Sequence, residues 1–345
     1  MAEWAEEGPS SELPAEMCAW CFAEHGDPAQ VLALRRTAVP VPGPGQLLVA
    51  VEAAAVNFAD ALIVRGDYQS SPPLPAVAGM ELAGRVVATG DGVERALGAR
   101  AAGLGAGMTG GFGEYAVMAA ADAFEPPAAY SAPEAACFTV AYQTAWFAIH
   151  VRGRLAAGET VLVHAAAGGV GLAAVQLAAA TGARVFGVVG SEAKAPAALA
   201  AGCEAVFLRD DPDLVGRLKE ASGGGIDVVV DPVGGRSHTV SERVVRFDGR
   251  IVLLGFASGD LPEVRPDLAM VKNYSVVGLH WGLYREKAPG VVVREYARLL
   301  EVVTTTGIRP LVSDVLDFQE VPAALARVAG GGSVGRVAVA GARRP

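Results

Sequence analysis

The stretch Val161-Leu-Val-His-Ala-Ala-Ala-Gly-Gly-Val-Gly171 decides how the rest of the chain is interpreted. A short apolar run ends at His164, glycine-rich residues follow, and an Ala/Leu/Val segment with helical spacing continues to Ala178. This order predicts a strand, a tight turn and a helix. Gly168 and Gly169 allow the backbone to approach a pyrophosphate, and the following helix offers free N–H groups and a positive dipole end. The stretch therefore indicates a dinucleotide site.

Two other interpretations of this stretch compete with a dinucleotide site. An Ala/Gly-rich segment in an Ala/Gly-rich chain can arise by chance, so the motif needs support from elsewhere. The absence of charge between Thr160 and Arg184 also gives a length that suggests a membrane span. His164, Gln176 and the central glycine pair argue against a span, because the turn leaves a strand and a helix that are each too short to cross a bilayer.

Composition limits the class of protein. The chain has 345 residues, 52% of them hydrophobic, and 28 Lys and Arg against 37 Asp and Glu give a net charge of −9. This length suggests about two domains with real cores. No basic cluster stands out, so we expect no nucleic-acid partner. Residues 1–16 are acidic and read as a mobile extension, the reverse of a basic apolar leader, so we expect a cytoplasmic protein without a membrane segment.

The four cysteines are too few and too scattered for a disulfide framework. Cys18 and Cys21 form a Cys-x-x-Cys pair, which can indicate zinc or redox chemistry. The surrounding segment reads as a strand, and residues three apart on a strand face opposite sides. We therefore expect two structural thiols that do not converge.

The first part of the chain reads as short strands separated by glycines between Gly66 and Gly103, which is typical of a small irregular β-barrel. A helix is predicted to begin at Ser131, with Ser131 as N-cap and Glu134 completing a capping box, and to run on towards His150.

After the glycine turn, strands and helices alternate. Six strands with crossovers predict an α/β fold with a doubly wound parallel sheet. The predicted strands are Val161–His164, 184–189, 205–208, 225–231, 250–255 and 274–280. A long helix is predicted over 290–306, and we expect the last part of the chain to return to the first domain.

Several short motifs occur together in a characteristic order. They are Asn57-Phe-Ala-Asp60, Gly79-Met-Glu81, Gly113-Glu-Tyr-Ala116, Ala165-x-x-Gly168-Gly-Val-Gly171, Asp231-Pro-Val-Gly-Gly235, Gly255-Phe-Ala-Ser-Gly259 and Ser333-Val-Gly-Arg336. In this order the chain resembles the zinc-independent quinone oxidoreductase (zeta-crystallin-like) branch of the medium-chain dehydrogenase/reductase superfamily. The resemblance implies a GroES-like β-barrel domain over 17–140 and 286–345, and a Rossmann domain with a six-stranded sheet over 141–285.

The resemblance also shows which zinc ligands are missing. Zinc-dependent relatives have His before the Glu of the Gly79-x-Glu81 motif, where this chain has Met80. They carry a catalytic cysteine in the region of Asn57 to Asp60 and four further cysteines for a structural zinc, and this chain has no cysteine between Cys21 and Cys137. Since thiolate and imidazole are the ligands that zinc needs, we predict no metal.

By resemblance, NADPH is the expected cofactor. Ser191 and Lys194 match the family's ligands to the 2′-phosphate, Arg209 stands where the family often has Tyr, and Arg336 matches another phosphate contact. A guanidinium suits a phosphate. Glu192 argues against a preference for NADPH, because NAD enzymes have an acid at this point that binds the ribose. A helix N-terminus also favours an acid, which gives Glu192 another explanation.

The expected reaction is hydride transfer from NADPH to a quinone or an α,β-unsaturated carbonyl. The resemblance places Asn57 and Thr144 at the nicotinamide–ribose end, and Gly168, Gly169 and Val170 at the pyrophosphate. It places Val233, Gly255, Phe256 and Trp281 along the cofactor and substrate cleft, with the alternatives that Asn57 only caps a turn and that Trp281 belongs to the core or to a dimer interface. Tyr68 is the candidate catalytic proton donor or substrate contact, against the alternative of a packed loop aromatic.

Other functions stay open at this point. An enoyl-thioester reductase or a reductase that tailors a secondary metabolite fits the same motifs, and so does a non-catalytic NADPH-binding redox sensor or scaffold. By resemblance, the strand at 275–280 is an open sheet edge that pairs across a twofold axis, so a homodimer is expected.

Overall fold

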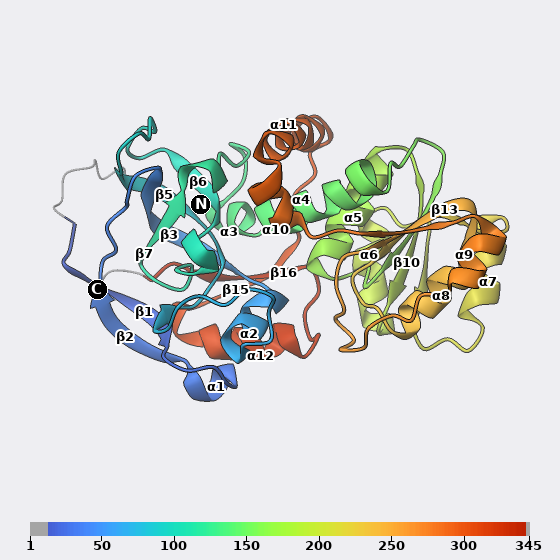
Figure 1. Cartoon of the computed structure of the whole chain (residues 1–345), viewed down its shortest axis with the longest axis horizontal. Helices are drawn as coiled ribbons and strands as arrows, with labels where there is room; N and C mark the ends of the chain where they lie inside the picture. The colour runs from blue at the N-terminus through green and yellow to red at the C-terminus, as the bar shows by residue number, and fades with distance from the viewer. Residues whose placement is uncertain (1–12, 343–345) are drawn as a thin grey trace. The chain divides into compact units, whose positions relative to one another are not determined.

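A computed structural model describes residues 13–342, which divide into two compact units. One unit contains the described residues up to Val140 together with those from Val312 on, and the other is Ala141–Leu311 (Figure 1). Residues 1–12 of the predicted acidic extension lie outside the described part, so that extension stays a prediction.

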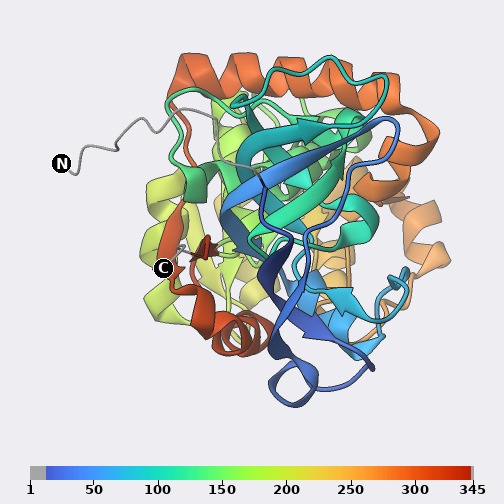
Figure 2. The same cartoon turned by 90° about the vertical axis from the view of Figure 1, so that its left-hand side faces the viewer.

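The first unit is built mainly from short antiparallel strands, as the glycine pattern predicted. A three-stranded sheet has the order β2-β1-β4, and a seven-stranded sheet has the order β15-β16-β3-β5-β6-β8 with β7 also paired to β3 (Figure 2). The strands are β1 Glu16–Phe22, β2 Ala33–Ala38, β3 Gln46–Val56, β4 Ala76–Val77, β5 Glu81–Thr89, β6 Arg100–Leu104, β7 Tyr115–Ala119, β8 Ala123–Phe124, β15 Val312–Leu316 and β16 Arg336–Ala340. The helices are α1 Pro28–Val31, α2 Phe58–Arg65, α3 Ala132–Ala136 and α12 Val321–Ala329.

The second unit contains a parallel sheet of six strands in the order β11-β10-β9-β12-β13-β14. The order reverses between β9 and β12, which confirms the predicted doubly wound sheet. The strands are β9 Thr160–His164, β10 Arg184–Val189, β11 Ala205–Leu208, β12 Ile226–Asp231, β13 Val245–Leu253 and β14 Ser275–Gly278. The helices are α4 Thr139–Trp146, which begins at the boundary, α5 Gly169–Ala180, α6 Ala195–Ala201, α7 Leu214–Ser222, α8 Arg236–Val244, α9 Pro266–Lys272, α10 Trp281–Lys287 and α11 Pro289–Thr306.

The boundary expected at residues 285 and 286 needs correction, because the structure groups residues 286–311 with the second unit. The reason lies in α10 and α11. The Trp146 indole N–H donates to the buried Glu295 carboxylate at 3.1 Å, and the Tyr284 ring packs edge-on against Phe147. Only the chain from Val312 on returns to the first unit.

Two local predictions concern the helix that begins after Ser131 and the pair Cys18 and Cys21. Ser131 caps α3 and Glu134 completes the capping box, but the helix breaks before α4 and ends in a π-helical turn, so the predicted single helix is wrong in its continuity. Cys18 and Cys21 lie on β1 as free thiols.

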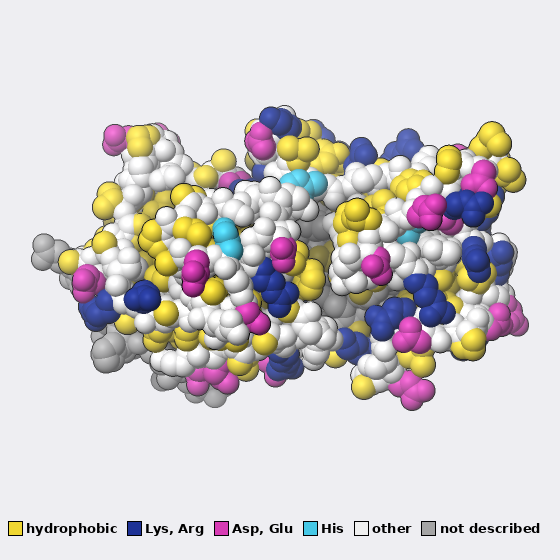
Figure 3. Space-filling model, turned by 60° about the horizontal axis from the view of Figure 1, so that its bottom comes forward, with side chains coloured by type: hydrophobic (Ala, Val, Ile, Leu, Met, Phe, Trp, Pro, Cys, Tyr) yellow, Lys and Arg dark blue, Asp and Glu magenta, His cyan; other side chains and the backbone are white. Residues whose placement is uncertain are grey.

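On the face drawn in Figure 3, several Lys and Arg side chains lie close together, with Asp and Glu side chains beside them. Among the described residues, no helix is both long and apolar enough to cross a membrane.

Candidate functional site

The glycine-rich turn has the geometry that its residues predicted. β9 ends at His164, Ala165 takes a left-handed φ of +49°, and α5 begins at Gly169 with Gly168 as N-cap. A Cβ at position 171 would lie 2.1 Å from the Ala165 carbonyl oxygen, so only glycine fits there. The amides of the first helical turn have no partners within the helix and are free to bind an anion.

The residues predicted to bind a 2′-phosphate are Ser191, Lys194 and Arg209, and they follow the next two strands. Ser191 and Lys194 come after β10, where Ser191 is the exposed N-cap of a short 3₁₀ helix over Glu192–Lys194. Arg209 follows β11, and its guanidinium lies beside Gly190, 3.6 Å from where a Cβ would stand. Carboxyl ends of parallel strands share one edge of a sheet, so these groups lie at the same edge as the glycine turn.

Glu192 is exposed at the N-terminus of that 3₁₀ helix. A helix N-terminus favours a carboxylate, so the placement gives Glu192 a structural reason other than a ribose contact.

A small pocket beside Arg209 contains a cation that sequence reasoning missed. Arg236, the first residue of α8, lines it together with Arg209. The Asp210 carboxylate lies 3.4 Å from Arg209 and 4.0 Å from Arg236, so both guanidinium groups reach the same acid. The rest of the lining is mixed and consists of Val188, Leu214, Val240, His164 and Ser237.

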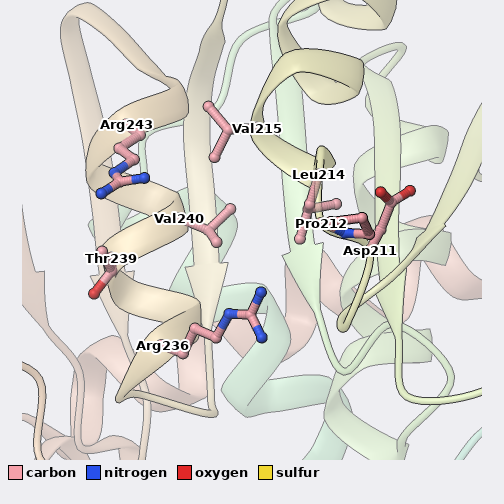
Figure 4. A pocket seen from close by; sticks show the side chains of 8 residues that line it. All are labelled: Asp211, Pro212, Leu214, Val215, Arg236, Thr239, Val240 and Arg243. Carbon is pink, nitrogen blue, oxygen red and sulfur yellow. The ribbon is translucent and has the colours of Figure 1, made fainter.

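A second pocket, lined by residues of α8, α7 and the loop before α7, shares Leu214, Arg236 and Val240 with the first. Figure 4 shows Arg236 pointing from α8 toward the loop that carries Pro212 and leads into α7, with Arg243 further along α8. The sequence signal for Arg236 was available, since it follows the Asp231-Pro-Val-Gly-Gly235 motif directly.

The loops after β12 and β13 hold three of the residues predicted for the cleft. The Asp231 carboxylate accepts from the Val233 and Gly234 amides at 2.9 and 3.0 Å. The Ser258 hydroxyl donates to the Val233 carbonyl at 2.7 Å, so the two loops are joined. Phe256 is 42% exposed, and Gly255 beside it is half-buried.

Two further predicted residues also belong to the second unit. Thr144 lies on α4 and is half-buried, whereas Trp281 begins α10 and is buried. The Arg285 guanidinium lies 5.6 Å from the centre of the Trp281 ring. These placements do not test the predicted contacts with a cofactor, and the alternative of Trp281 as a core residue stays open.

A buried polar cluster behind the glycine turn was not predicted. The His164 Nε2 atom lies 2.9 Å from the Ser241 hydroxyl, and His238 lies between the Asp231 and Glu242 carboxylates at 3.9 and 3.5 Å. Burial lowers the pKa of His164 although the Asp231 charge opposes it. His164 is therefore neutral, and its hydrogen bond with Ser241 stabilises the end of β9.

In the first unit, Asn57 and Arg336 belong to one buried cluster. Arg336 donates from Nη1 to the Asn57 amide oxygen at 2.9 Å and from Nη2 to Glu81 Oε2 at 2.6 Å. Asn57 Nδ2 donates to the same Glu81 oxygen at 3.1 Å. The predicted contact between Arg336 and a cofactor phosphate stays untested, but both terminal nitrogens of this guanidinium already have protein partners.

Asp60 completes this cluster. Its two carboxylate oxygens accept from the Asn57 and Met80 amides, each at 2.8 Å. Burial raises the pKa of Asp60 to about 7, against the lowering effect of these two bonds. Burial also raises the pKa of Glu81, and the Arg336 guanidinium acts against that rise.

Tyr68 lies in the loop after α2 and is half-buried. This placement fits a substrate contact as well as a packed loop aromatic, so its role stays a prediction. Among residues 13–342, no group of three or more His, Cys, Asp or Glu side chains is arranged to hold a metal ion.

A doubly wound parallel sheet with a glycine-rich turn after its first strand, in one chain with an antiparallel β unit, defines the class of medium-chain dehydrogenases and reductases. Two family models match: the alcohol dehydrogenase GroES-like domain over residues 43–128 and the zinc-binding dehydrogenase over residues 169–298.

Similar proteins narrow this class. Quinone oxidoreductase-like protein 2 of Bos taurus is 36% identical over 301 residues, covering 85% of this chain and 84% of that protein. The human synaptic vesicle membrane protein VAT-1 homolog is 34% identical over 321 residues, covering 88% and 81%. The crystal structure of Escherichia coli quinone oxidoreductase complexed with NADPH has a TM-score of 0.85 at 29% identity and covers 94% of this chain and 99% of that one. The chain belongs to the quinone oxidoreductase family of the medium-chain dehydrogenase/reductase superfamily, and it is an oxidoreductase of that superfamily.

Proposed function

We propose that the protein is an NADPH-dependent oxidoreductase that reduces a quinone or an α,β-unsaturated carbonyl compound without zinc. The observation that carries the proposal is the carboxyl edge of the parallel sheet. There the glycine turn offers amides for a pyrophosphate, and Ser191, Lys194 and Arg209 follow the next two strands. The complex of the E. coli quinone oxidoreductase with NADPH supports this cofactor.

The residues at this edge fit a dinucleotide with an additional phosphate. Gly168, Gly169 and Val170 bring backbone amides of a helix N-terminus to the edge, where a pyrophosphate is stabilised. Arg209 and Arg236 converge on one carboxylate, and a phosphate suits such a pair of guanidinium groups better than a ribose hydroxyl does. These contacts favour NADPH over NADH.

The ligand chemistry of the first unit supports a reaction without zinc. Zinc-dependent relatives have an imidazole where this chain has Met80, and a thiolate in the region of Asn57 to Asp60, where this chain has no cysteine. The neighbouring carboxylate of Glu81 is bonded to Arg336 and Asn57. An amide and a thioether do not supply the ligand set of a catalytic zinc.

When bound, NADPH supplies the hydride, and the protein orients the reactants and excludes water. We assign Asn57 and Thr144 to the nicotinamide–ribose end. Val233, Gly255, Phe256 and Trp281 line the path of the cofactor and acceptor. Tyr68 is the candidate proton donor or acceptor contact, and a quinone can also take its proton from water.

Steady-state oxidation of NADPH with two acceptors tests this proposal. An ortho-quinone and a trans-2-enoyl thioester are compared side by side, and we expect turnover with the quinone. Turnover with the thioester alone would move the protein to enoyl reduction or to the tailoring of a metabolite. Tight binding of NADPH without turnover of either acceptor would contradict the proposed activity.

A second candidate is a non-catalytic NADPH-binding protein, such as a redox sensor or scaffold. The specific observation in its favour is the relative whose name refers to a synaptic vesicle membrane rather than to a reaction. Both candidate functions use the same residues at the carboxyl edge of the parallel sheet to bind NADPH, so only the turnover experiment distinguishes them.

We also propose a cytoplasmic homodimer. β14 is the last strand of the parallel sheet and bonds only to β13 among the described strands, so its outer edge can pair with a second copy. Light scattering in solution should give twice the mass of the 35.2 kDa chain, and a monomer would contradict this pairing.

A further inference from the structure

The buried polar cluster behind the glycine turn has no role in the proposed function as stated above. Its titratable members at the strand ends and on α8 are His164, which ends β9, Asp231, which ends β12, and His238 and Glu242, which lie one turn apart on α8. Each of these four side chains is at most 2% exposed. Titratable groups are found at such depth only where they are paired or hydrogen-bonded, so the charge of this cluster has to be balanced from within.

His238 lies between two carboxylates. Its Nδ1 atom is 3.9 Å from Asp231 Oδ2, and its Nε2 atom is 3.5 Å from Glu242 Oε1. Within residues 13–342, neither ring nitrogen has a hydrogen-bond partner, and Asp231 Oδ2 has none either. A neutral imidazole has one N–H and one lone pair, so either tautomer would point a lone pair at a carboxylate oxygen. Only the doubly protonated ring presents a donor to both acids.

The arginine and lysine near this ring have other partners. The Arg265 guanidinium pairs with the Asp267 carboxylate at 2.6 Å, at an exposed position. Lys272 Nζ donates to the main-chain carbonyl of Glu242 at 2.7 Å, near the end of α8. In the described part of the chain, neither cation forms an ion pair with Asp231 or with the Glu242 carboxylate.

The titratable neighbours on β9 and before β14 carry no positive charge. Burial lowers the pKa of His164, and the Asp231 charge opposes this effect only in part. The Tyr274 hydroxyl donates a hydrogen bond to the Glu242 carboxylate at 2.8 Å. Two buried carboxylates without a cation are unfavourable, so a proton on His238 supplies the charge that balances them.

The two carboxylates also hold the loops that follow β12 and β13. Asp231 Oδ1 accepts from the Val233 and Gly234 amides at 2.9 and 3.0 Å. Glu242 Oε1 accepts from the Arg265 amide at 2.8 Å, at the far end of the second loop. The ring between these two acids therefore connects both loops.

We propose that His238 is a positioning residue whose imidazolium, held between Asp231 and Glu242, keeps the loops after β12 and β13 in the arrangement that binds the cofactor. This inference rests on the proposed function, because Val233 and Phe256 of these loops are assigned there to the path of the cofactor and acceptor. Loss of the proton turns a lone pair toward one carboxylate and releases the loop that this carboxylate holds. The contribution of His238 to the affinity for NADPH is therefore lost as pH rises.

The protonation state is measured directly by ¹⁵N NMR of the histidine rings. The chain has five histidines, so the signals of His238 are assigned by their loss in His238→Gln. We expect both ring nitrogens of His238 to be protonated at pH 7 in the wild type. A ring with one unprotonated nitrogen at pH 7 would overturn the proposal.

Hydrogen exchange followed by mass spectrometry tests whether the ring holds the loops, and it needs no cofactor. At pH 7, residues 233–236 and 255–265 should exchange at least about fivefold faster in His238→Gln than in the wild type. The control is His25→Gln, which removes a histidine from the first unit and should leave both segments unchanged. Equal exchange in His238→Gln and the wild type would contradict the role of the ring.

The pH dependence of binding separates the proton from the shape of the side chain. At pH 6.5 the Kd of NADPH should be about tenfold higher in His238→Gln than in the wild type, and the two values should come within about twofold at a pH where NMR shows a neutral ring. They converge because the wild type has then lost the proton that the variant never carries. A ratio that does not change with pH would assign the effect to shape alone and would overturn the proposal.

A second variant, Glu242→Gln, keeps an acceptor for the Arg265 amide but removes one of the two charges. It should speed exchange in residues 255–265, and it keeps the proposal testable where His238→Gln does not fold. Exchange at the wild-type rate in Glu242→Gln would count against the proposal. In the Glu242→Gln background, His238→Gln should raise the Kd of NADPH by less than about twofold further, whereas independent, multiplicative effects would refute a shared role.

The outcome for His238 is separate from the outcome for the proposed function. If the wild type neither binds nor oxidises NADPH, the proposed function fails by that observation. The NMR signals and the hydrogen exchange of the two loops then still decide whether the imidazolium holds them.

Discussion

Asp60 is the single residue whose charge state sets the cost of the buried cluster in the first unit. It is buried, and the Arg336 guanidinium in the same cluster forms its ion pair with Glu81 instead. Two buried carboxylates and one guanidinium leave a net negative charge away from water. A negative charge in this position is costly unless a proton neutralises it.

The pH dependence of stability follows from the pKa of Asp60, which burial raises from 3.8 to about 7. Between these two values the folded protein binds a proton that the unfolded chain does not bind. The contribution of Asp60 to the free energy of unfolding is therefore fully present at low pH and is lost as pH rises, by up to about 1.4 kcal/mol per pH unit. Urea unfolding of wild type and Asp60→Asn at pH 5, 6, 7 and 8 measures the difference.

We expect the stability of wild type relative to Asp60→Asn to decrease from pH 5 to about pH 7 and then to level off. A difference that is flat or increases over this range would mean that the two backbone amides keep Asp60 ionised in the folded protein.

Arg236 is the residue on which the preference for NADPH is tested most cleanly. Arg236→Gln should raise the Kd of NADPH about tenfold, the value of one charge-assisted contact of about 1.4 kcal/mol, and should leave the Kd of NADH within about twofold. Intrinsic fluorescence titration gives both constants.

The matched control is Arg243→Gln, because Arg243 lies on the same helix and lines the second pocket together with Arg236, but does not line the pocket beside Arg209. An equal loss for both dinucleotides in Arg236→Gln would assign this residue to the adenine or to the fold instead of the 2′-phosphate.

At the scale of single elements, the turn between β9 and α5 leaves no room for a side chain at its last glycine. A Cβ at Gly171 would lie 2.1 Å from the Ala165 oxygen, so Gly171→Ala must displace the turn or the helix. We expect a loss of about 1–3 kcal/mol in the free energy of unfolding and a weaker Kd for NADPH. Thermal melting and titration measure these effects.

Gly290→Ala on α11 serves as the comparison, since a Cβ there meets no atom within 4 Å. If Gly171→Ala melts and binds like Gly290→Ala, the turn is not the rigid element described here.

The elements that the sequence predicted well are those whose signals are local. The period of the apolar residues and the glycine turn predicted five of the six strands of the parallel sheet to within two residues, whereas β13 begins at Val245, five residues before the predicted start. The Ser131 capping box was found from four letters. α9 and α10 were missed because they are short and rest on tertiary contacts. The π-helical turn at 147–152 has no local signature either.

Some residues of the candidate site were likewise predicted from the sequence, whereas others depend on the tertiary structure and were not. Ser191, Lys194 and Arg209 follow strand ends and were assigned from the resemblance to the family. Arg236 reaches the same edge from a strand on the other side of β9, which only the sheet order reveals. The bonding of Arg336 to Asn57 depends on pairing between residues 279 positions apart, and no short-range pattern contains it.

At the scale of the whole molecule, the division into two units makes a prediction about fragments. The second unit ends at Leu311, so α11 and its buried residues belong to it. These residues are Val292, Tyr296, Leu299 and Val303, together with Glu295, which bonds to Trp146.

A fragment of residues 141–311 should fold and bind NADPH, and a fragment of residues 141–285 should not melt cooperatively. Circular dichroism melts of both fragments test this. Equal melting of the two would restore the boundary that the sequence suggested.

The most direct test of the proposed function is an anaerobic single turnover. The protein is mixed with one equivalent of NADPH and then with an ortho-quinone, and the absorbance of both is followed by stopped flow. We expect that one quinone is reduced for each NADPH oxidised. NADPH that binds tightly but stays reduced in the presence of both the quinone and an enoyl thioester would contradict it.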